Sequence, residues 1–203
     1  MSKADLRKIF KAKRALLSQD EVKTRSQQIN ENFLQNLLPK FYKKNSDKIF
    51  SLYLAMPSEV STNLIAEHFI KNQIPFSYPK IIAANKPLQF TLFDQEAEFV
   101  ANKSFTKIKE PAEGKIISPD FLILPLLAFD LGLSRLGMGG GFFDRTIKSL
   151  KKKKSKIITI GLAFDFQLSQ DYLPTEETDQ NLDFTVTEKN LFSSSRTSLG
   201  LST

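Results

Sequence analysis

The sequence predicts an α/β protein, and two observations lead to this class. Short apolar, β-prone runs alternate along the chain with segments whose apolar residues recur at helical spacing. A cluster of glycines also follows one of the strand-like runs and leads into a helix-like segment. Together they predict a three-layer fold, in which a mostly parallel, Rossmann-like sheet is flanked by helices on both faces.

The N-terminal segment is expected to be helical. Ser2 is suited to cap a helix, and Asp5 stands at the third position after it. Apolar residues then recur at helical spacing, which predicts an amphipathic helix over residues 3–17. A second helix is predicted over residues 20–38, with its end set by Pro39.

The rest of the chain alternates between the two kinds of element. Strands are predicted at residues 48–54, 74–82, 88–93, 120–125, 157–163 and 183–186. Helices are predicted at residues 59–72 and 142–150, and the polar stretch 94–119 is expected to be mostly loop.

Length and composition limit the class of protein. A chain of 203 residues suits one domain, which we place at residues 1–192, with a serine-rich tail at 193–203 that we expect to be disordered. The chain has no cysteine, so disulfides and thiolate chemistry are excluded. Lysine and arginine interrupt the N-terminal apolar residues, and no apolar run reaches membrane-spanning length. We therefore expect a cytoplasmic protein without a membrane partner.

The net charge of +7 favours anionic partners. Nucleic acid, an acidic membrane surface, and phosphate or carboxylate ligands all satisfy it. Nucleic-acid binders usually interleave basic residues with exposed aromatic ones, whereas the 18 phenylalanines here fall mostly in apolar, core-like runs. We interpret the run Lys151–Lys154 as the solvated end of a helix and expect no nucleic-acid partner.

The glycines carry the strongest functional signal. The chain has only 8 of them, and most are concentrated between residues 132 and 141. At a strand-to-helix turn they let backbone amides approach an anion at the positive end of a helix. Arg135 and Arg145 could add charge for phosphoryl oxygens, and Asp144 could hold Mg²⁺. The segment contains no Walker motif, and a tight turn that needs glycine for steric reasons remains the alternative.

The segment LPLLAFDLGLSRLGMGGGFFDR, residues 124–145, strongly resembles the signature of the 5-formyltetrahydrofolate cyclo-ligases, also called methenyltetrahydrofolate synthetases. Three further matches follow the family's order. They are the KxxLR element at residues 3–7, the E-x-x-T element within residues 54–62, and the C-terminal run between residues 160 and 188. The resemblance spans nearly the whole chain.

The resemblance implies an enzyme that uses ATP and Mg²⁺ to convert 5-formyltetrahydrofolate into 5,10-methenyltetrahydrofolate, as a monomer or weak homodimer with small-molecule partners only. Arg135 and Asp144 would be its catalytic residues. The residues implied for the ATP site are Lys3, Arg7, Arg135, Leu136, Gly137, Met138, Gly139, Gly140, Gly141, Phe142 and Phe143.

For the folate, the resemblance implies contacts from Leu54, Met56, Glu59, Phe142 and Phe143, and for the metal it implies Asp144 and Asp179. The chain departs from the family where tyrosines are usual, at Met138 and Phe142–Phe143, and where histidine is frequent, at Thr178. Phenylalanine keeps a flat apolar ring but lacks the hydroxyl. We expect these departures to alter affinity and not the reaction.

Each assignment has a structural alternative. Lys3 and Arg7 could form a solvated helix face, and Glu59 could complement the dipole of a helix from its first turn. Met56 could fill the core, and Asp179 could be an ordinary surface residue. His68, the only histidine, is expected on a helix face without a catalytic role. An α/β enzyme for another phosphorylated ligand would share the glycine loop but not the Lys3–Arg7 and Glu59 elements.

Overall fold

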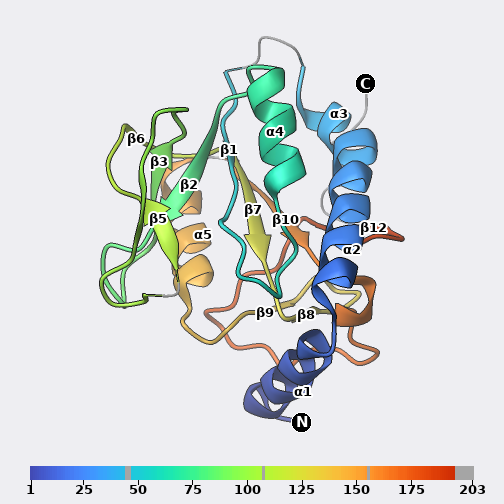
Figure 1. Cartoon of the computed structure of the whole chain (residues 1–203). Coiled ribbons are helices and arrows are strands. Elements are labelled where there is room, and N and C mark those ends of the chain that lie inside the picture. Colours follow the sequence, from blue (N-terminus) through green and yellow to red (C-terminus); the bar gives the residue numbers. More distant parts are fainter. Residues whose placement is uncertain (44–46, 107, 155, 195–203) are drawn as a thin grey trace.

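The computed structural model describes residues 1–43, 47–106, 108–154 and 156–194, and its centre is one twisted eight-stranded sheet (Figure 1). In spatial order the strands are β12 (Leu191–Ser193), β11 (Phe184–Val186), β10 (Ile158–Leu162), β7 (Phe121–Pro125), β1 (Phe50–Ser51), β2 (Phe76–Lys80), β3 (Gln89–Leu92) and β6 (Ile116–Ile117). The strands from β11 to β2 run parallel to one another, whereas β12, β3 and β6, toward the two edges, pair antiparallel with their neighbours.

Helices cover both faces of this sheet. On one face lie α2 (Gln19–Asn32), α3 (Leu38–Phe41) and α4 (Asn63–Lys71), and on the other lies α5 (Phe142–Lys153). The alternation of side chains along β7 shows the two layers: Phe121 and Ile123 pack in the first core, while Leu122 and Leu124 pack with α5 in the second. The predicted three-layer, mostly parallel α/β fold is confirmed.

The first helix, α1 (Lys3–Ala15), lies below the sheet in Figure 1, beside the hairpin of β8 (Ala128–Phe129) and β9 (Arg135–Leu136). Ser2 and Asp5 form the predicted capping box at its start. Leu6 and Phe10 are buried against residues of the β8–β9 region, which fixes the helix in place.

The second predicted helix continues past Pro39, contrary to the prediction. After α2 the chain passes through a π-helical turn, η1 (Phe33–Leu37), into α3, which ends at Phe41. Pro39 stands in the first turn of α3, where a backbone amide needs no partner within the helix. A proline is therefore tolerated there.

Other boundaries also differ from prediction. Helix α4 begins at Asn63, four residues later than expected, and the predicted loop 94–119 contains β4 (Phe99–Ala101), β5 (Lys109–Pro111) and β6. These strands have two or three residues, too few to give a periodic pattern in sequence. Ser193, assigned to the tail, pairs with Phe184 in the sheet. Residues 195–203 of that tail lie outside the described part of the chain.

A short 3₁₀ turn, η2 (Asp165–Gln167), completes the elements. Within the described residues, no helix combines the length and apolar character needed to cross a membrane.

Candidate active site

A cavity of about 900 Å³ opens at the carboxyl ends of three neighbouring parallel strands. Leu54 lies just after β1, Ile81 just after β2 and Leu126 just after β7, and all three line it. Further walls come from the start of α1, the loop 137–141, the first turns of α5 and the segment 176–179. This is where an open parallel sheet usually binds its ligands.

Every residue that the sequence analysis assigned to ATP, folate or metal lines this one cavity. They are Lys3, Arg7, Leu54, Met56, Glu59, Arg135, Leu136, Gly137, Met138, Gly139, Gly140, Gly141, Phe142, Phe143, Asp144 and Asp179. They come from four separate stretches of the chain, so the fold alone brings them together. His68 lies half-buried on α4 and is not part of the lining.

The glycine loop needs glycine for its backbone shape. Gly139 has φ +103° and Gly141 has φ +64°, values that other residues rarely adopt. Gly141 is the left-handed residue that begins α5, and no side chain caps this helix. The positive end of α5 therefore faces the cavity with the loop backbone around it, an arrangement suited to an anion.

Arg7 lies against this loop. Its Nε donates a 3.0 Å hydrogen bond to the carbonyl oxygen of Gly137, and its guanidinium stands within van der Waals distance of the space a Cβ at Gly139 would occupy. Because Arg7 is half-buried and tied to the loop, the alternative of an ordinary solvated helix face is wrong for it.

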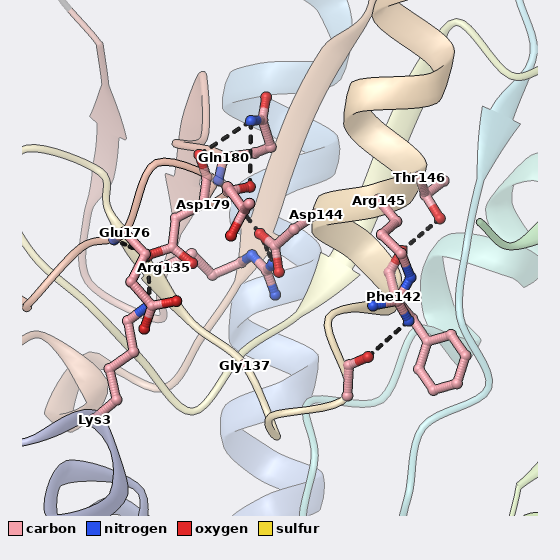
Figure 2. A network of polar contacts seen from close by, with 12 residues as sticks. Lys3, Arg135, Gly137, Phe142, Asp144, Arg145, Thr146, Glu176, Asp179 and Gln180 are labelled. Atoms are coloured by element: carbon pink, nitrogen blue, oxygen red, sulfur yellow. Dashed lines mark hydrogen bonds and ion pairs between the residues drawn. The ribbon is translucent and has the colours of Figure 1, made fainter. Parts of the chain in front are cut away.

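Arg135 and Asp144 form an ion pair at the base of the loop (Figure 2). Nη2 of Arg135 donates to Oδ1 of Asp144 at 2.6 Å, and the same oxygen accepts from the backbone amide of Gln180 at 3.3 Å. The Arg135 side chain is only 3% exposed, and its Nε has no hydrogen-bond partner within the described residues. A buried donor without a partner at a cavity wall is suited to an anionic ligand.

Lys3 reaches from α1 to the segment 176–179 (Figure 2). Its Nζ lies 2.5 Å from Oδ2 of Asp179 and 3.0 Å from Oε1 of Glu176. The Lys3 side chain is only 16% exposed, so it is not a solvated lysine, and Asp179 is likewise engaged with partners across the cavity. The surface alternatives for these two residues are therefore wrong.

The two charges stabilise each other. Burial alone would raise the pKa of Asp179, but hydrogen bonds from Lys3 and the Glu176 amide, with the charges of Lys3 and Arg135, hold that pKa below its usual value. Burial would lower the pKa of Lys3, yet its bonds to Asp179 and Glu176 raise it. Both groups are thus ionised at neutral pH.

The carboxylates of Asp144 and Asp179 fit a magnesium site shared with a ligand. In each, one oxygen is engaged by protein donors, and the other accepts no hydrogen bond from the described residues. No cluster of three or more metal-ligating side chains occurs in the described part of the chain. Mg²⁺ commonly uses only one or two carboxylates and completes its shell with water and phosphate oxygens, so this donor set suffices.

Glu59 also lines the cavity, together with Leu54 and Met56, and forms another part of its wall. The side chain is 6% exposed, and its Oε2 accepts a 3.0 Å hydrogen bond from the amide of Met56. Since α4 begins only at Asn63, Glu59 is not in the first turn of a helix, and the helix-dipole alternative is wrong. Met56 lines the cavity and is half-buried, so it does not simply fill the core.

Burial raises the pKa of the Glu59 carboxyl, while the hydrogen bond from the Met56 amide and the charge of Arg14 oppose that rise. Nη1 of Arg14 lies 3.8 Å from Oε1 of Glu59. This wall thus combines one buried acceptor with apolar surface, as a heterocycle with an N–H edge would require.

Phe142 forms an aromatic contact between the glycine loop and the β4–β5 hairpin. Its ring meets Phe105 edge-on at 5.6 Å, and the Arg145 guanidinium lies 5.2 Å from its centroid. Arg145 Nη2 also donates to the carbonyl oxygens of Gly140 and Ala84. Arg145 therefore holds the loop in place.

Sequence reasoning did not find part of the lining. Tyr53, Pro79, Ile81, Ile108 and Lys109 also face the cavity. Tyr53 precedes Leu54 and could have been included with it. Ile108 precedes β5 and Lys109 begins it, in the stretch predicted as loop, and nothing in their local sequence indicates a ligand.

A parallel α/β sheet with a glycine loop, paired charges and a substrate-sized cavity at its carboxyl edge defines an α/β enzyme. The sequence model of the 5-formyltetrahydrofolate cyclo-ligase family matches residues 1–188. The chain therefore belongs to the 5-formyltetrahydrofolate cyclo-ligase family, and the family resemblance found in its sequence is confirmed.

Individual relatives and a solved structure agree with this family assignment. The chain is 34% identical over 151 residues to the 5-formyltetrahydrofolate cyclo-ligase of Escherichia coli K12, covering 70% of this chain and 79% of that one. It is 31% identical over 190 residues to the enzyme of the same name from Mycoplasma pneumoniae, covering 93% and 100%. The structure of Aquifex aeolicus 5,10-methenyltetrahydrofolate synthetase superimposes with a TM-score of 0.77 at 31% identity, covering 95% of this chain and 93% of the other.

Proposed function

We propose that this protein converts 5-formyltetrahydrofolate into 5,10-methenyltetrahydrofolate. The reaction that its sequence resemblance implies consumes ATP and requires Mg²⁺. The observation that carries the proposal is one cavity with two unlike walls. One wall has a helix N-terminus, a glycine loop and the cations Lys3, Arg7 and Arg135. The other has the buried carboxylate of Glu59 beside the apolar side chains of Leu54 and Met56.

The cationic wall suits the triphosphate of ATP. Loop amides and arginine guanidinium groups can bind phosphoryl oxygens, and a bound anion would compete with Asp144 and Asp179 for Arg135 and Lys3. Mg²⁺ held by Asp144 and Asp179 would neutralise charge on the phosphate oxygens. Phosphoryl transfer asks the protein mainly for positioning and charge neutralisation, which these residues can supply.

The apolar wall suits the folate. Oε1 of Glu59 can accept hydrogen bonds from the amino edge of the pterin, and the rings of Phe142 and Phe143 can pack on its face. In the proposed reaction the formyl oxygen attacks the γ-phosphorus of ATP and ADP leaves. N10 then attacks the activated formyl carbon, loses its proton, and phosphate departs with the formyl oxygen.

Absorbance spectroscopy tests the proposal. Methenyltetrahydrofolate absorbs at longer wavelength than the substrate, so its formation can be followed continuously with purified protein. We expect the product band to grow only when 5-formyltetrahydrofolate, ATP and Mg²⁺ are all present. A flat trace in the complete mixture would contradict the proposal, and a thermal-shift panel would then show whether ATP or another phosphorylated compound stabilises the protein.

A further inference from the structure

Helix α1 presents one continuous stripe to the rest of the molecule. Lys3 and Arg7 line the cavity, and Leu6 and Phe10 are buried in the adjacent small core. One turn after Phe10 on the same stripe comes Arg14, which is only 5% exposed. An arginine this deeply buried needs a partner, because its charge cannot be neutralised by losing a proton.

The partner of Arg14 is Glu59. The 3.8 Å between Nη1 of Arg14 and Oε1 of Glu59 is an ion pair without a direct hydrogen bond. The two oxygens of Glu59 thus have different roles: Oε2 accepts from the amide of Met56, whereas Oε1 faces the guanidinium and accepts no hydrogen bond from the described residues. Oε1 keeps its capacity to accept one from a ligand.

We propose that Arg14 is a positioning residue for the folate: it keeps Glu59 ionised and oriented so that Oε1 accepts an N–H from the pterin. This inference rests on the proposed function, and it adds a residue outside the cavity lining to the set that determines substrate affinity. Arg14 itself is not among the residues that line the cavity.

The electrostatics of the pair support this role. The charged or titratable groups acting on Glu59 are Arg14, from α1, and Tyr53, whose hydroxyl donates to the carbonyl of Val60. Burial raises the pKa of Glu59, while the hydrogen bond from the Met56 amide and the charge of Arg14 oppose the rise. Without Arg14, the buried carboxyl would take up a proton more readily. The protonated form is a poorer acceptor for the N–H edge of a pterin.

The position of Arg14 on α1 also suggests an internal control. The same helix carries Lys3 and Arg7 on the cationic wall, so a substitution that displaced α1 would weaken ATP binding together with folate binding. A substitution that acted only through Glu59 would weaken folate binding and leave the KM for ATP nearly unchanged. The change in the KM for folate relative to the change in the KM for ATP therefore distinguishes positioning of Glu59 from a general structural role of Arg14.

The test is steady-state kinetics of methenyltetrahydrofolate formation between about pH 6 and pH 9 for Arg14→Met, Arg14→Lys and Arg25→Met. Arg14→Lys keeps the charge. Arg25→Met is a matched control, because Arg25 pairs with Glu188, a 7% exposed carboxylate, at 3.3 Å and does not line the cavity.

For Arg14→Met we expect the KM for 5-formyltetrahydrofolate to rise about 10- to 100-fold at neutral pH, as for loss of a hydrogen bond to a charged group. The defect should grow as pH falls and shrink as pH rises, because alkaline conditions restore the Glu59 carboxylate. Arg14→Lys should recover most of the affinity, and Arg25→Met should behave like the wild type.

An unchanged folate KM in Arg14→Met, equal rises in both KM values, or a defect independent of pH would overturn the inference while the wild type still forms product. A wild type that forms no product would overturn the proposed function and this inference with it.

If Arg14→Met does not fold, Arg14→Lys and Arg14→Gln are compared in its place. In the Glu59→Gln background, loss of Arg14 should add little to the folate KM, and an additive effect would contradict the proposed role.

Discussion

Arg135 and Asp144 join the two ends of the glycine loop: Nη2 of Arg135, on β9, donates a 2.6 Å hydrogen bond to Oδ1 of Asp144, in the first turn of α5. The loop 137–141 lies between them. The pair therefore fixes the loop and holds a cation and a carboxylate beside each other in the cavity. An anionic group of a ligand could bind Arg135, and a cation bound to that ligand could be held by Asp144.

We expect Arg135→Ala and Asp144→Ala each to lower kcat/KM by about 10²- to 10³-fold, the usual effect of removing one group that stabilises charge in a transition state. Thermal unfolding should show that both variants remain folded. Lys152→Ala, exposed on the same helix α5, should keep full activity. If both cavity variants kept wild-type activity, the site assignment would be wrong.

Asp144→Asn separates two roles of this carboxylate. The amide oxygen can still accept from Arg135, so the melting temperature should stay close to that of the wild type, but the ligand charge for Mg²⁺ is lost. We expect the Mg²⁺ concentration needed for half-maximal rate to rise. An unchanged requirement would show that Asp144 serves only to orient Arg135.

Gly139→Ala should weaken ATP binding. At φ +103° an alanine is strained by about 1–3 kcal/mol, and the loop can relieve this only by changing its backbone conformation beside Arg7. Kinetics should show a raised KM for ATP with a smaller change for the folate. Gly132→Ala is the control, because Gly132 has no positive φ and lies outside the cavity. Equal effects of the two substitutions would contradict this account of the loop.

The Lys3–Asp179 ion pair gives a pH signature. The folded-state pKa of Asp179 is lowered, so its contribution to stability is present above the unfolded value of about 3.9 and is lost as pH falls through the folded value. The folded-state pKa of Lys3 is raised, so the contribution of Lys3 to stability is present below about pH 10.4 and is lost as pH rises through the folded-state pKa.

Asp179→Asn should therefore lower the free energy of unfolding by roughly 0.5–1 kcal/mol near pH 7, the size expected for a pair partly screened by solvent. Urea unfolding at a series of pH values should show the difference from wild type fading below about pH 4. Asp171→Asn, at an exposed position, is the control. A constant difference down to the lowest pH would contradict the assignment.

Truncation can test the tail. Among the described residues, those that line the cavity all precede residue 180, and Ser193 pairs with Phe184 in the sheet. We expect a chain that ends after Ser194 to keep its kcat and both KM values. A chain that ends after Phe192 should be less stable, because it loses that pairing and the hydrogen bond from the Ser194 amide to Asp183. A lower rate in the first truncation would contradict this expectation.

The features that the sequence predicted correctly are local ones. The capping box of Ser2 and Asp5 and the buried strand at β7 each depend on residues that are neighbours in the chain. The glycine loop belongs here too, because a positive φ at Gly139 and Gly141 restricts the residue type at those positions themselves. Where the local signal was short or ambiguous, as for β4, β5 and the passage through Pro39, prediction failed.

The sequence by itself thus determined the α/β class, the loop that faces the cavity and, through resemblance, the family. Only the tertiary structure decided which charges meet. Lys3 and Asp179 are 176 positions apart, and the Arg14–Glu59 and Arg135–Asp144 pairs join different elements. Helical spacing and glycine content are set by short-range sterics, which a single sequence displays. Contacts between distant residues depend on strand order and on how α1 packs beneath the sheet, and no local pattern records that arrangement.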